Sequence, residues 1–284
     1  MMKNQKVLVV GATGYLGKFL VKELKSQGYW VRALSRDQAK IEPIRESIDE
    51  VVLGEATQPE TIKGLCKDID IVISSLGITK QKEGLTYMEV DYQANKNILH
   101  EALMNNVTQF MYISVFNSHQ LRHLEIVKAK EKFAQELMKS DIKHLIIRPN
   151  GFFSDVTELV KMAKKGHVYL FGRGEYRANP IHGADLAKAC VEHLNLDGGE
   201  FDIGGPEILT QKEMASQAFE ALNKTSKITY IPLWVGKLTI QLARIFTSVK
   251  TYGPLEFFMT VLVMDMVAPT YGQHTLKEYF KEMS

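Results

Sequence analysis

Cysteine is scarce in this chain, which limits the kinds of framework it can use. Cys66 and Cys190 are the two cysteines among 284 residues, and they lie far apart with no metal-ligand spacing. Such sparse use is typical of a reducing compartment and argues against a disulfide framework. We therefore expect a cytoplasmic protein without a metal site.

Long apolar runs and a large net charge are also missing. The longest apolar runs fall well short of the roughly 18 residues that suggest a membrane-spanning helix. The formal net charge is +2, so no strong attraction to nucleic acid is expected. A strand is expected within a few residues of Met1, so we expect no signal peptide. With 45% hydrophobic residues, the chain can build a sizeable globular core.

The clearest pattern present is VLVVGATGYLG, from Val7 to Gly17. A short β-type run is followed by Gly11, Gly14 and Gly17, and then by apolar residues at helical spacing. In a strand–turn–helix unit, such glycines allow a tight turn, close approach to a pyrophosphate and close helix packing. The free amides of the helix N-terminus attract phosphate. The pattern predicts a dinucleotide site; an ordinary glycine turn before a helix is the alternative.

The end of the second predicted strand bears on which dinucleotide is bound. Residues 29–35 read as a strand, Arg36 follows it, and no acidic residue precedes Asp37. In dinucleotide folds an acid at this position holds the ribose 2′-hydroxyl, whereas an arginine accommodates a 2′-phosphate. Arg36 therefore favours NADP (NADPH) over NAD; the alternative is a solvated loop arginine.

Six strands alternating with helices are predicted along the first 150 residues. The other strands fall at Val51–Leu53, Asp70–Gly77, Phe110–Val115 and Ile142–Arg148. This alternation predicts an α/β fold with a doubly wound parallel sheet. Ligands bind at the carboxyl ends of such strands. Further candidates for lining the adenine and the bridging ribose are therefore Glu55, Ala56, Ser75, Leu76 and Gly77.

The last third of the chain differs in character. We expect a dinucleotide-binding domain at residues 1–150 and a smaller, helical substrate-binding region at 151–284, partly integrated with the first domain. Thr210 and Glu213 have the spacing of a helix capping box. Between Ile231 and Ala268, large apolar residues predict amphipathic helices that roof a substrate cleft. Plain core packing is an alternative, and contact with a membrane surface is another.

Several motifs in the same order resemble the atypical short-chain dehydrogenase/reductase superfamily. They are GATGYLG, VRALSR (31–36), YISV (112–115), VKAKEKFAQEL (127–137), IIRPNGFF (146–153), FDIGGPEILT (201–210) and GQHTLKEYF (272–280). The most similar branch contains the NmrA-like and divinyl-chlorophyllide-reductase-like proteins. The resemblance covers nearly the whole chain, is specific for a Rossmann fold and its cofactor, and is weak for the substrate.

The resemblance also implies roles for individual residues. It implies that NADP is held by Gly11, Thr13, Gly14, Tyr15, Leu16 and Gly17, with Arg36 on the 2′-phosphate. Lys128 matches the family lysine that bonds the nicotinamide ribose, and Ser114 matches the serine at the end of the fifth strand; these are the two catalytic candidates. The turn Pro149, Asn150, Gly151 and Phe152 would lie beside the nicotinamide.

One departure from the family pattern bears on catalysis. The family acid is a tyrosine four residues before the lysine, whose positive charge lowers the tyrosine pKa. That position holds Leu124. A literal Tyr-x-x-x-Lys at Tyr92 and Lys96 lies one strand–helix unit too early, so we interpret it as a chance match. Other proton donors considered are His119, Tyr112 and His123, each with an ordinary packing or surface role as the alternative.

Three functions follow from these patterns. The first is an NADPH-dependent reductase of a small apolar acceptor, such as a quinone or a conjugated alkene. The second is a non-catalytic NADP-binding redox sensor or assembly factor, suggested by Leu124. The third is a nucleotide-sugar epimerase-like enzyme, against which the missing tyrosine argues.

Overall fold

The computed structural model describes residues 5–78 and 84–283, and its chain divides into two compact units. The first unit joins residues 1–148 to 187–201, and the second joins 149–186 to 202–284. A stretch from the last third of the chain therefore returns to the first unit.

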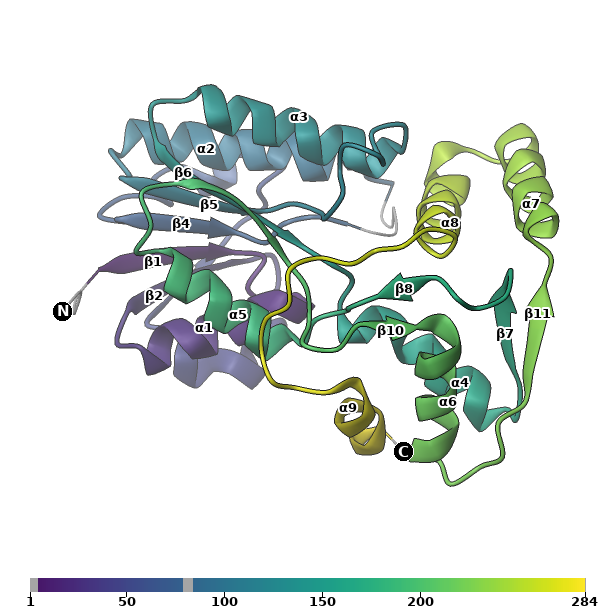
Figure 1. Cartoon of the computed structure of the whole chain (residues 1–284). Coiled ribbons are helices and arrows are strands. Elements are labelled where there is room, and N and C mark those ends of the chain that lie inside the picture. The colour runs from purple at the N-terminus through teal and green to yellow at the C-terminus, as the bar shows by residue number, and fades with distance from the viewer. Residues whose placement is uncertain (1–4, 79–83, 284) are drawn as a thin grey trace. The chain divides into compact units, whose positions relative to one another are not determined.

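Seven strands form the sheet of the first unit, in the order β3-β2-β1-β4-β5-β6-β9 (Figure 1). They are β1 (Lys6–Val10), β2 (Trp30–Ser35), β3 (Glu50–Leu53), β4 (Ile71–Ser74), β5 (Gln109–Ile113), β6 (Lys143–Pro149) and β9 (Gly199–Ile203). Neighbouring strands from β3 to β6 run parallel. The six predicted strands are all present, and a short strand that the sequence predicts at 201–206 corresponds to β9, which lies beside β6 as the seventh strand.

Helices cover both faces of this sheet, which confirms the doubly wound prediction. Figure 1 shows α2 (Asn95–Met104) and α3 (Glu125–Lys139) on one face, and α1 (Tyr15–Ser26) and α5 (Gly183–His193) on the other. Val7, Leu8 and Val9 of β1 are fully buried. A parallel strand covered on both faces explains why this run is apolar without alternation.

The helix after β4 is not α-helical throughout. It opens as a π-helix, η4 (Met88–Ala94), before α2 continues it. The Asn95 side chain donates to the carbonyls of Asp91 (2.9 Å) and Val90 (3.4 Å), inside the wider turn. A side-chain amide that occupies backbone carbonyls explains why the α-helical ladder starts later. Three short 3-10 turns complete the unit: η1 (Gln38–Lys40), η2 (Glu42–Ser47) and η3 (Pro59–Ile62).

The second unit packs helices against short strands around a core that contains Phe153, Val160, Phe219 and Phe280. Its elements are η5 (Phe153–Val156), α4 (Thr157–Lys164), β7 (Val168–Phe171), β8 (Arg177–Ala178), β10 (Leu209–Thr210), α6 (Gln211–Ala221), β11 (Ile228–Ile231), α7 (Leu233–Phe246), α8 (Val249–Val261) and α9 (Leu276–Glu282). The predicted capping box begins α6, because Glu213 accepts from the Thr210 amide at 2.7 Å.

Candidate functional site

The turn after β1 has a backbone that requires glycine. Gly11 has a φ of +85°, which L side chains rarely adopt. The Gly14 amide donates to the Gly11 carbonyl at 3.0 Å and closes the turn. A Cβ on Gly17 would lie 2.0 Å from the Gly11 oxygen, so the helix approaches the turn more closely than any side chain permits.

The N-terminus of α1 is open to a ligand. Gly14 is its N-cap and makes no side-chain capping bond, and the first turn holds no acidic residue. Gly14 is exposed, whereas Leu16 and Gly17 are buried against the sheet. The backbone amides at a helix N-terminus and the positive end of the helix dipole together favour a phosphate group.

Arg36 follows β2 and meets an acidic neighbour across the edge of the sheet. Its Nη1 lies 3.7 Å from Oε1 of Glu55, and about half of the Arg36 side chain is exposed. The Thr57 hydroxyl donates to the same Glu55 oxygen at 2.9 Å. The two predicted ribose-side residues are therefore brought together, with the guanidinium accessible to an anion.

The end of β4 lies beside the glycine turn. The Ser75 hydroxyl donates to the Val10 carbonyl at 3.1 Å, and a Cβ on Gly11 would lie 2.8 Å from the Ser75 Oγ. The backbone of the other candidates is also fixed: Asn97 donates to the Ala56 carbonyl at 2.9 Å, and Asn95 to that of Leu76 at 3.4 Å. The candidates of the first unit from Gly11 to Gly77 thus lie at the carboxyl ends of β1, β2, β3 and β4.

Two lysines of α3 have opposite surroundings. Lys128, the predicted family lysine, is exposed, and its Nζ lies 2.5 Å from Oε1 of Glu125 on the same helix. Lys130 is largely buried, and its Nζ lies 2.9 Å from Oδ1 of Asp91. The signal that finds Lys130 is its spacing from Val127, Phe133 and Ala134, which form the buried face of α3.

Lys130 belongs to a buried charged group under the Gly77 turn. A Cβ on Gly77 would lie 2.6 Å from Asp91 Oδ1 and 2.8 Å from Lys130 Nζ. Burial lowers the pKa of Lys130, but Tyr112 and Asp91 outweigh burial and hold this pKa above its ordinary value. Burial raises the pKa of Tyr112, with the Lys130 charge only partly opposing it. Lys130 is thus a fixed cation beside the predicted cofactor turn.

Ser114 lies in a second buried polar cluster. Its hydroxyl donates to Glu131 at 3.0 Å, and Arg148 contacts both residues. Arg148 also reaches Glu200 of β9 at 2.6 Å. These bonds tie α3, β6 and β9 together, which gives Ser114 a structural role in the described chain.

The literal Tyr-x-x-x-Lys has an environment unlike that of a catalytic pair. The Tyr92 hydroxyl donates to Glu136 of α3, and Lys96 lies 3.1 Å from that carboxylate. The hydrogen bond to Glu136 raises the pKa of Tyr92, as does burial, while Lys96 opposes them. A tyrosine acid needs a lowered pKa, so this arrangement favours the interpretation as a chance match.

The other candidate proton donors lie either in the core or on the surface. Tyr112 is fully buried, and its ring centroid lies 4.7 Å from that of Phe133. His119 and His123 are exposed on the segment between β5 and α3. Leu124, at the family tyrosine position, is buried at the N-cap of α3.

The Pro149–Phe152 turn belongs to the second unit. Asn150 donates to Asn179 Oδ1 at 2.8 Å and to the Met266 carbonyl at 2.5 Å. The Gly151 amide donates back to the Asn150 side chain at 2.8 Å. Within this unit Asn150 therefore joins the start of the second unit to residues near 266.

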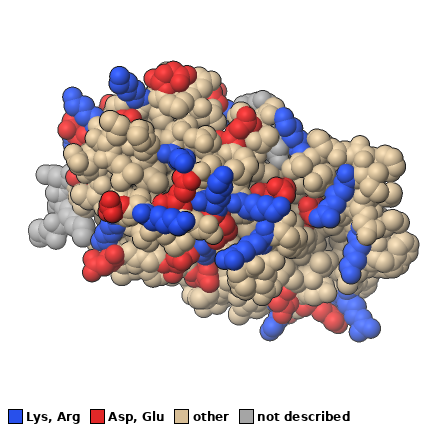
Figure 2. Space-filling model, turned by 90° about the horizontal axis from the view of Figure 1, so that it is seen from above, with Lys and Arg blue, Asp and Glu red and all other residues tan. Residues whose placement is uncertain are grey.

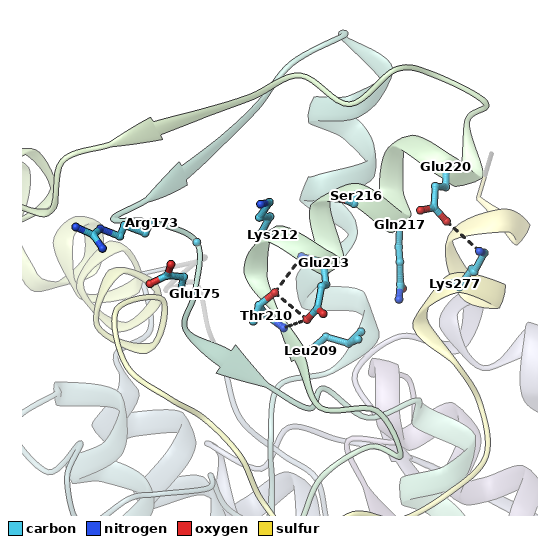
Figure 3. A pocket seen from close by; sticks show the side chains of 11 residues that line it. Arg173, Glu175, Leu209, Thr210, Lys212, Glu213, Ser216, Gln217, Glu220 and Lys277 are labelled. Atoms are coloured by element: carbon cyan, nitrogen blue, oxygen red, sulfur yellow. Dashed lines mark hydrogen bonds and ion pairs between the residues drawn. The ribbon is translucent and has the colours of Figure 1, made fainter.

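The second unit also holds a hollow of about 620 Å³ beside α6 (Figure 3). Lys212, Ser216, Gln217 and Glu220 come from α6, and Lys277 of α9 pairs with Glu220 at 2.9 Å. The remaining lining residues are Arg173, Gly174, Glu175, Leu209, Thr210 and Glu213. Both signs of charge line this hollow, so it favours no ligand class.

The described residues show neither a metal-binding cluster nor a membrane-spanning helix. Residues 5–78 and 84–283 contain no group of three histidine, cysteine or acidic side chains placed to hold a metal ion. Within the same ranges no helix has both the length and the apolarity to cross a membrane.

Comparison with known proteins places the fold and the cofactor class. A family model described as NAD(P)H-binding matches residues 11–197. Divinyl chlorophyllide a 8-vinyl-reductase of Arabidopsis thaliana is 29% identical over 99% of this chain and 77% of its own. The photosystem II assembly factor Ycf39 of Guillardia theta is 25% identical over 94% of this chain and 88% of its own.

Solved structures share the fold over nearly the full length. An NADPH-dependent quinone oxidoreductase from Escherichia coli has a TM-score of 0.73 at 14% identity, covering 98% of this chain and 99% of its own. A nucleoside-diphosphate-sugar epimerase from Staphylococcus aureus has a TM-score of 0.72 at 14% identity, covering 98% and 100%. Together with the relatives, these matches confirm the resemblance to atypical short-chain dehydrogenases/reductases.

Proposed function

We propose that this chain, which belongs to the NAD(P)H-binding family, is an NADPH-dependent reductase of an apolar acceptor. The observation that carries the proposal is the open N-terminus of α1 behind the Gly11–Gly17 turn. A family described by its NAD(P)H binding, and a turn that only glycine can form, point to the same ligand.

The residues of the first unit fit such a cofactor. In our proposal the amides of the first turn of α1 bind the pyrophosphate, with Thr13 and Tyr15 beside it. Ser75, Leu76 and Gly77 line the path toward the nicotinamide half, and Glu55 and Ala56 lie toward the adenosine. Lys130 replaces Lys128 as the lysine that we expect to act near the nicotinamide ribose, because its ammonium lies under the Gly77 turn.

The preference for NADPH rests on Arg36. A guanidinium binds a phosphate through two parallel hydrogen bonds. Glu55 keeps Arg36 near the ribose position without burying it. Both cysteines of the described chain are buried and free, which agrees with the reducing, cytoplasmic location that belongs to this proposal.

The acceptor class is proposed from chemistry. When bound, NADPH supplies a hydride, and a quinone or conjugated alkene takes up that hydride together with one proton. The Arabidopsis relative is named for reducing a vinyl group and the E. coli structure for reducing quinones. Because Tyr112 is buried and Leu124 replaces the family acid, we propose that solvent supplies the proton.

The test is stopped-flow oxidation of bound NADPH against quinones, enones and aldehydes. We expect fast oxidation by at least one quinone or enone, and little by aldehydes, which need a positioned acid. Tight NADPH binding with no oxidation by any acceptor would refute the reductase proposal.

That outcome would favour the second candidate, a non-catalytic NADP-binding sensor or assembly factor. Leu124 is the observation that favours it, since a buried leucine cannot donate a proton. The name of the Guillardia relative, an assembly factor, agrees with it. An epimerase-like activity is disfavoured because epimerization in this fold uses the tyrosine that Leu124 replaces.

A further inference from the structure

The outer face of α7 carries an apolar stripe. Trp234, Leu238, Leu242 and Ile245 follow one another at helical spacing, and Phe246 ends the helix beside them. Trp234 is 65% exposed, Ile245 72% and Phe246 78%. Contiguous exposed apolar side chains of this size are uncommon and mark interaction sites.

The opposite face of α7 is already used for packing. Gly236 is the buried residue of this helix, and a Cβ there would lie 2.4 Å from Met259 Cε of α8. Arg244 pairs with the buried Glu256 of α8. The orientation of α7 on α8 is therefore fixed within this unit, and the apolar stripe is what remains outside.

The stripe continues past the connection between the two helices. Val249 opens α8 and is exposed, as are Leu255 and Leu262 further along it. We use the name hairpin face for the exposed apolar side chains of α7, which are Trp234, Leu238, Leu242, Ile245 and Phe246, together with Val249 of α8. It combines tryptophan, phenylalanine and branched aliphatic side chains.

The charged residues of the segment 221–255 are all basic, and Glu256 directly after it is buried and paired with Arg244. Residues 221–255 contain no aspartate or glutamate. Of the basic residues in this segment, Lys224 donates to the Lys164 carbonyl at 2.6 Å, whereas Lys237 lies on α7 and Lys250 on α8. Figure 2 shows the surface over α7 and α8 as mostly tan, with lysine and arginine side chains among the uncharged atoms and few acidic ones.

We propose that the hairpin face docks on the surface of an anionic lipid bilayer. Helices that lie in a membrane interface combine apolar and aromatic side chains on one face with basic side chains beside them. α7 and α8 have 14 and 13 residues, too short to span the hydrocarbon layer. The arrangement thus corresponds to a helix pair that lies on one leaflet.

Charge argues against a second copy of this chain as the occupant. In a two-fold interface the same patch faces itself. Lys237 of α7 and Lys250 of α8 would then approach their equals, with no acidic residue in the segment 221–255 to pair with. An anionic headgroup layer offers the complementary charge instead.

This inference goes beyond the proposed reductase activity and does not depend on it. Vesicle binding is measured without NADPH or any acceptor, so failure of one proposal leaves the other standing. If both hold, docking brings the protein to the phase in which apolar quinones or alkenes dissolve.

The experiment is flotation of the full chain with vesicles of phosphatidylcholine alone or with 30% phosphatidylglycerol, a test composition of about one anionic lipid in three. We expect binding to the anionic vesicles that weakens with salt. In a Trp30→Phe background, the emission of Trp234 should shift to the blue, because its indole enters the interface.

Two pairs of variants test the two parts of the face. The double variant Ile245→Ser with Phe246→Ser should lower vesicle binding about tenfold or more. The control is Leu53→Ser with Met104→Ser, two exposed residues of the first unit, which should leave vesicle binding unchanged. Lys237→Gln with Lys250→Gln should lower binding to anionic vesicles about tenfold, and Lys22→Gln with Lys63→Gln should leave it unchanged. Circular dichroism checks that each variant is folded.

Absence of flotation with anionic vesicles overturns the proposal. If size-exclusion chromatography with light scattering then shows a dimer that Ile245→Ser and Phe246→Ser dissolve, a second copy occupies the face. Flotation that is equal for the face variants and their controls also overturns it.

Discussion

At the scale of single residues, Lys128 and Lys130 lie two residues apart on α3, about 200° around the helix, and have different environments. Lys128→Ala should change the free energy of unfolding by less than about 0.5 kcal/mol, since surface substitutions cost little. Lys130→Ala leaves the carboxylate of Asp91 buried without its partner, so we expect a loss of about 3–5 kcal/mol. Urea unfolding of both variants measures the difference.

A double variant separates the charge from the packing at this position. Asp91→Asn with Lys130→Met removes both charges and keeps the volumes, so it should recover most of the stability lost in Lys130→Ala. Equal losses for Lys128→Ala and Lys130→Ala would contradict the assignment of Lys130 as the structurally important lysine.

Arg36 carries the second prediction at this scale. Arg36→Ala should raise the Kd for NADPH about 10- to 100-fold, because charge-assisted bonds to a phosphate are worth roughly 1.5–3 kcal/mol. The Kd for NADH should remain within about twofold, since it has no 2′-phosphate. Arg173→Ala, in the second unit, is the matched control. Fluorescence titration measures both constants, and equal losses for the two cofactors would contradict the assignment.

Sequence patterns place the glycine turn more reliably than they identify which lysine of α3 is buried. The glycine turn is fixed by local backbone geometry, so its spacing was sufficient to place Gly11, Gly14 and Gly17 at one turn. Whether a lysine of α3 points inward depends on how that helix packs against η4 and β5. The family motif alone selected Lys128, two residues from the lysine that the packing buries.

At the scale of elements, the β1–α1 unit permits a test that separates folding from binding. Gly17→Ala should cost at least about 2–3 kcal/mol of stability, because its Cβ would meet a backbone carbonyl that cannot move aside. Gly14 has a φ of −72°, and a Cβ there would lie 3.2 Å from the same oxygen. Gly14→Ala should therefore cost about 1 kcal/mol or less.

The effects of Gly14→Ala and Gly17→Ala on cofactor binding should rank in a different order from their effects on stability. Gly14 is exposed at the N-cap, where a methyl group would intrude on the pyrophosphate. We expect Gly14→Ala to weaken NADPH binding at least about tenfold while the chain remains folded. Calorimetry of NADPH binding, with urea unfolding in parallel, measures both effects; unchanged binding by Gly14→Ala would place the phosphate elsewhere.

Element positions were well predicted where periodicity is strong and less well where side chains intervene. β1 to β6 lie close to their predicted ranges, and α6 begins at the predicted capping box, because burial and capping act locally. The π-helical start of η4 depends on Asn95, whose amide bonds to backbone carbonyls. The spacing of hydrophobic residues in the sequence gives no indication of such a hydrogen bond.

At the scale of the whole molecule, the sheet depends on residues far apart in sequence. β9 joins β6 after the chain has formed part of the second unit, and the Arg148–Glu200 ion pair links these two strands. A strand as short as 199–203 has too little hydrophobic periodicity to indicate which strand it pairs with. The sequence therefore predicts a short strand near residues 201–206 but not its pairing with β6 as the seventh strand of the sheet.

The pH dependence of stability provides the last prediction, and it concerns the second unit. The rings of His182 and His274 stack with centroids 4.3 Å apart, and His274 Nδ1 lies 2.7 Å from Asp185. Burial lowers the pKa of His182 below its ordinary 6.5, as does His274, while Asp185 and Glu282 oppose them. The unfolded chain then binds a proton at His182 more readily than the folded chain does.

This contribution to stability is complete above pH 6.5 and is lost as the pH falls through 6.5 toward the lowered folded value. Urea unfolding between pH 7.5 and 5, test limits on either side of about 6.5, follows the second unit through Trp234 in the Trp30→Phe background. His182→Asn removes the titrating group, so the variant should lose less stability on acidification than the parent. The difference between the two curves isolates His182 from the carboxylates that both share. Parallel curves for parent and variant would show that His182 titrates alike in both states, and that its stacking on His274 leaves its proton affinity unchanged.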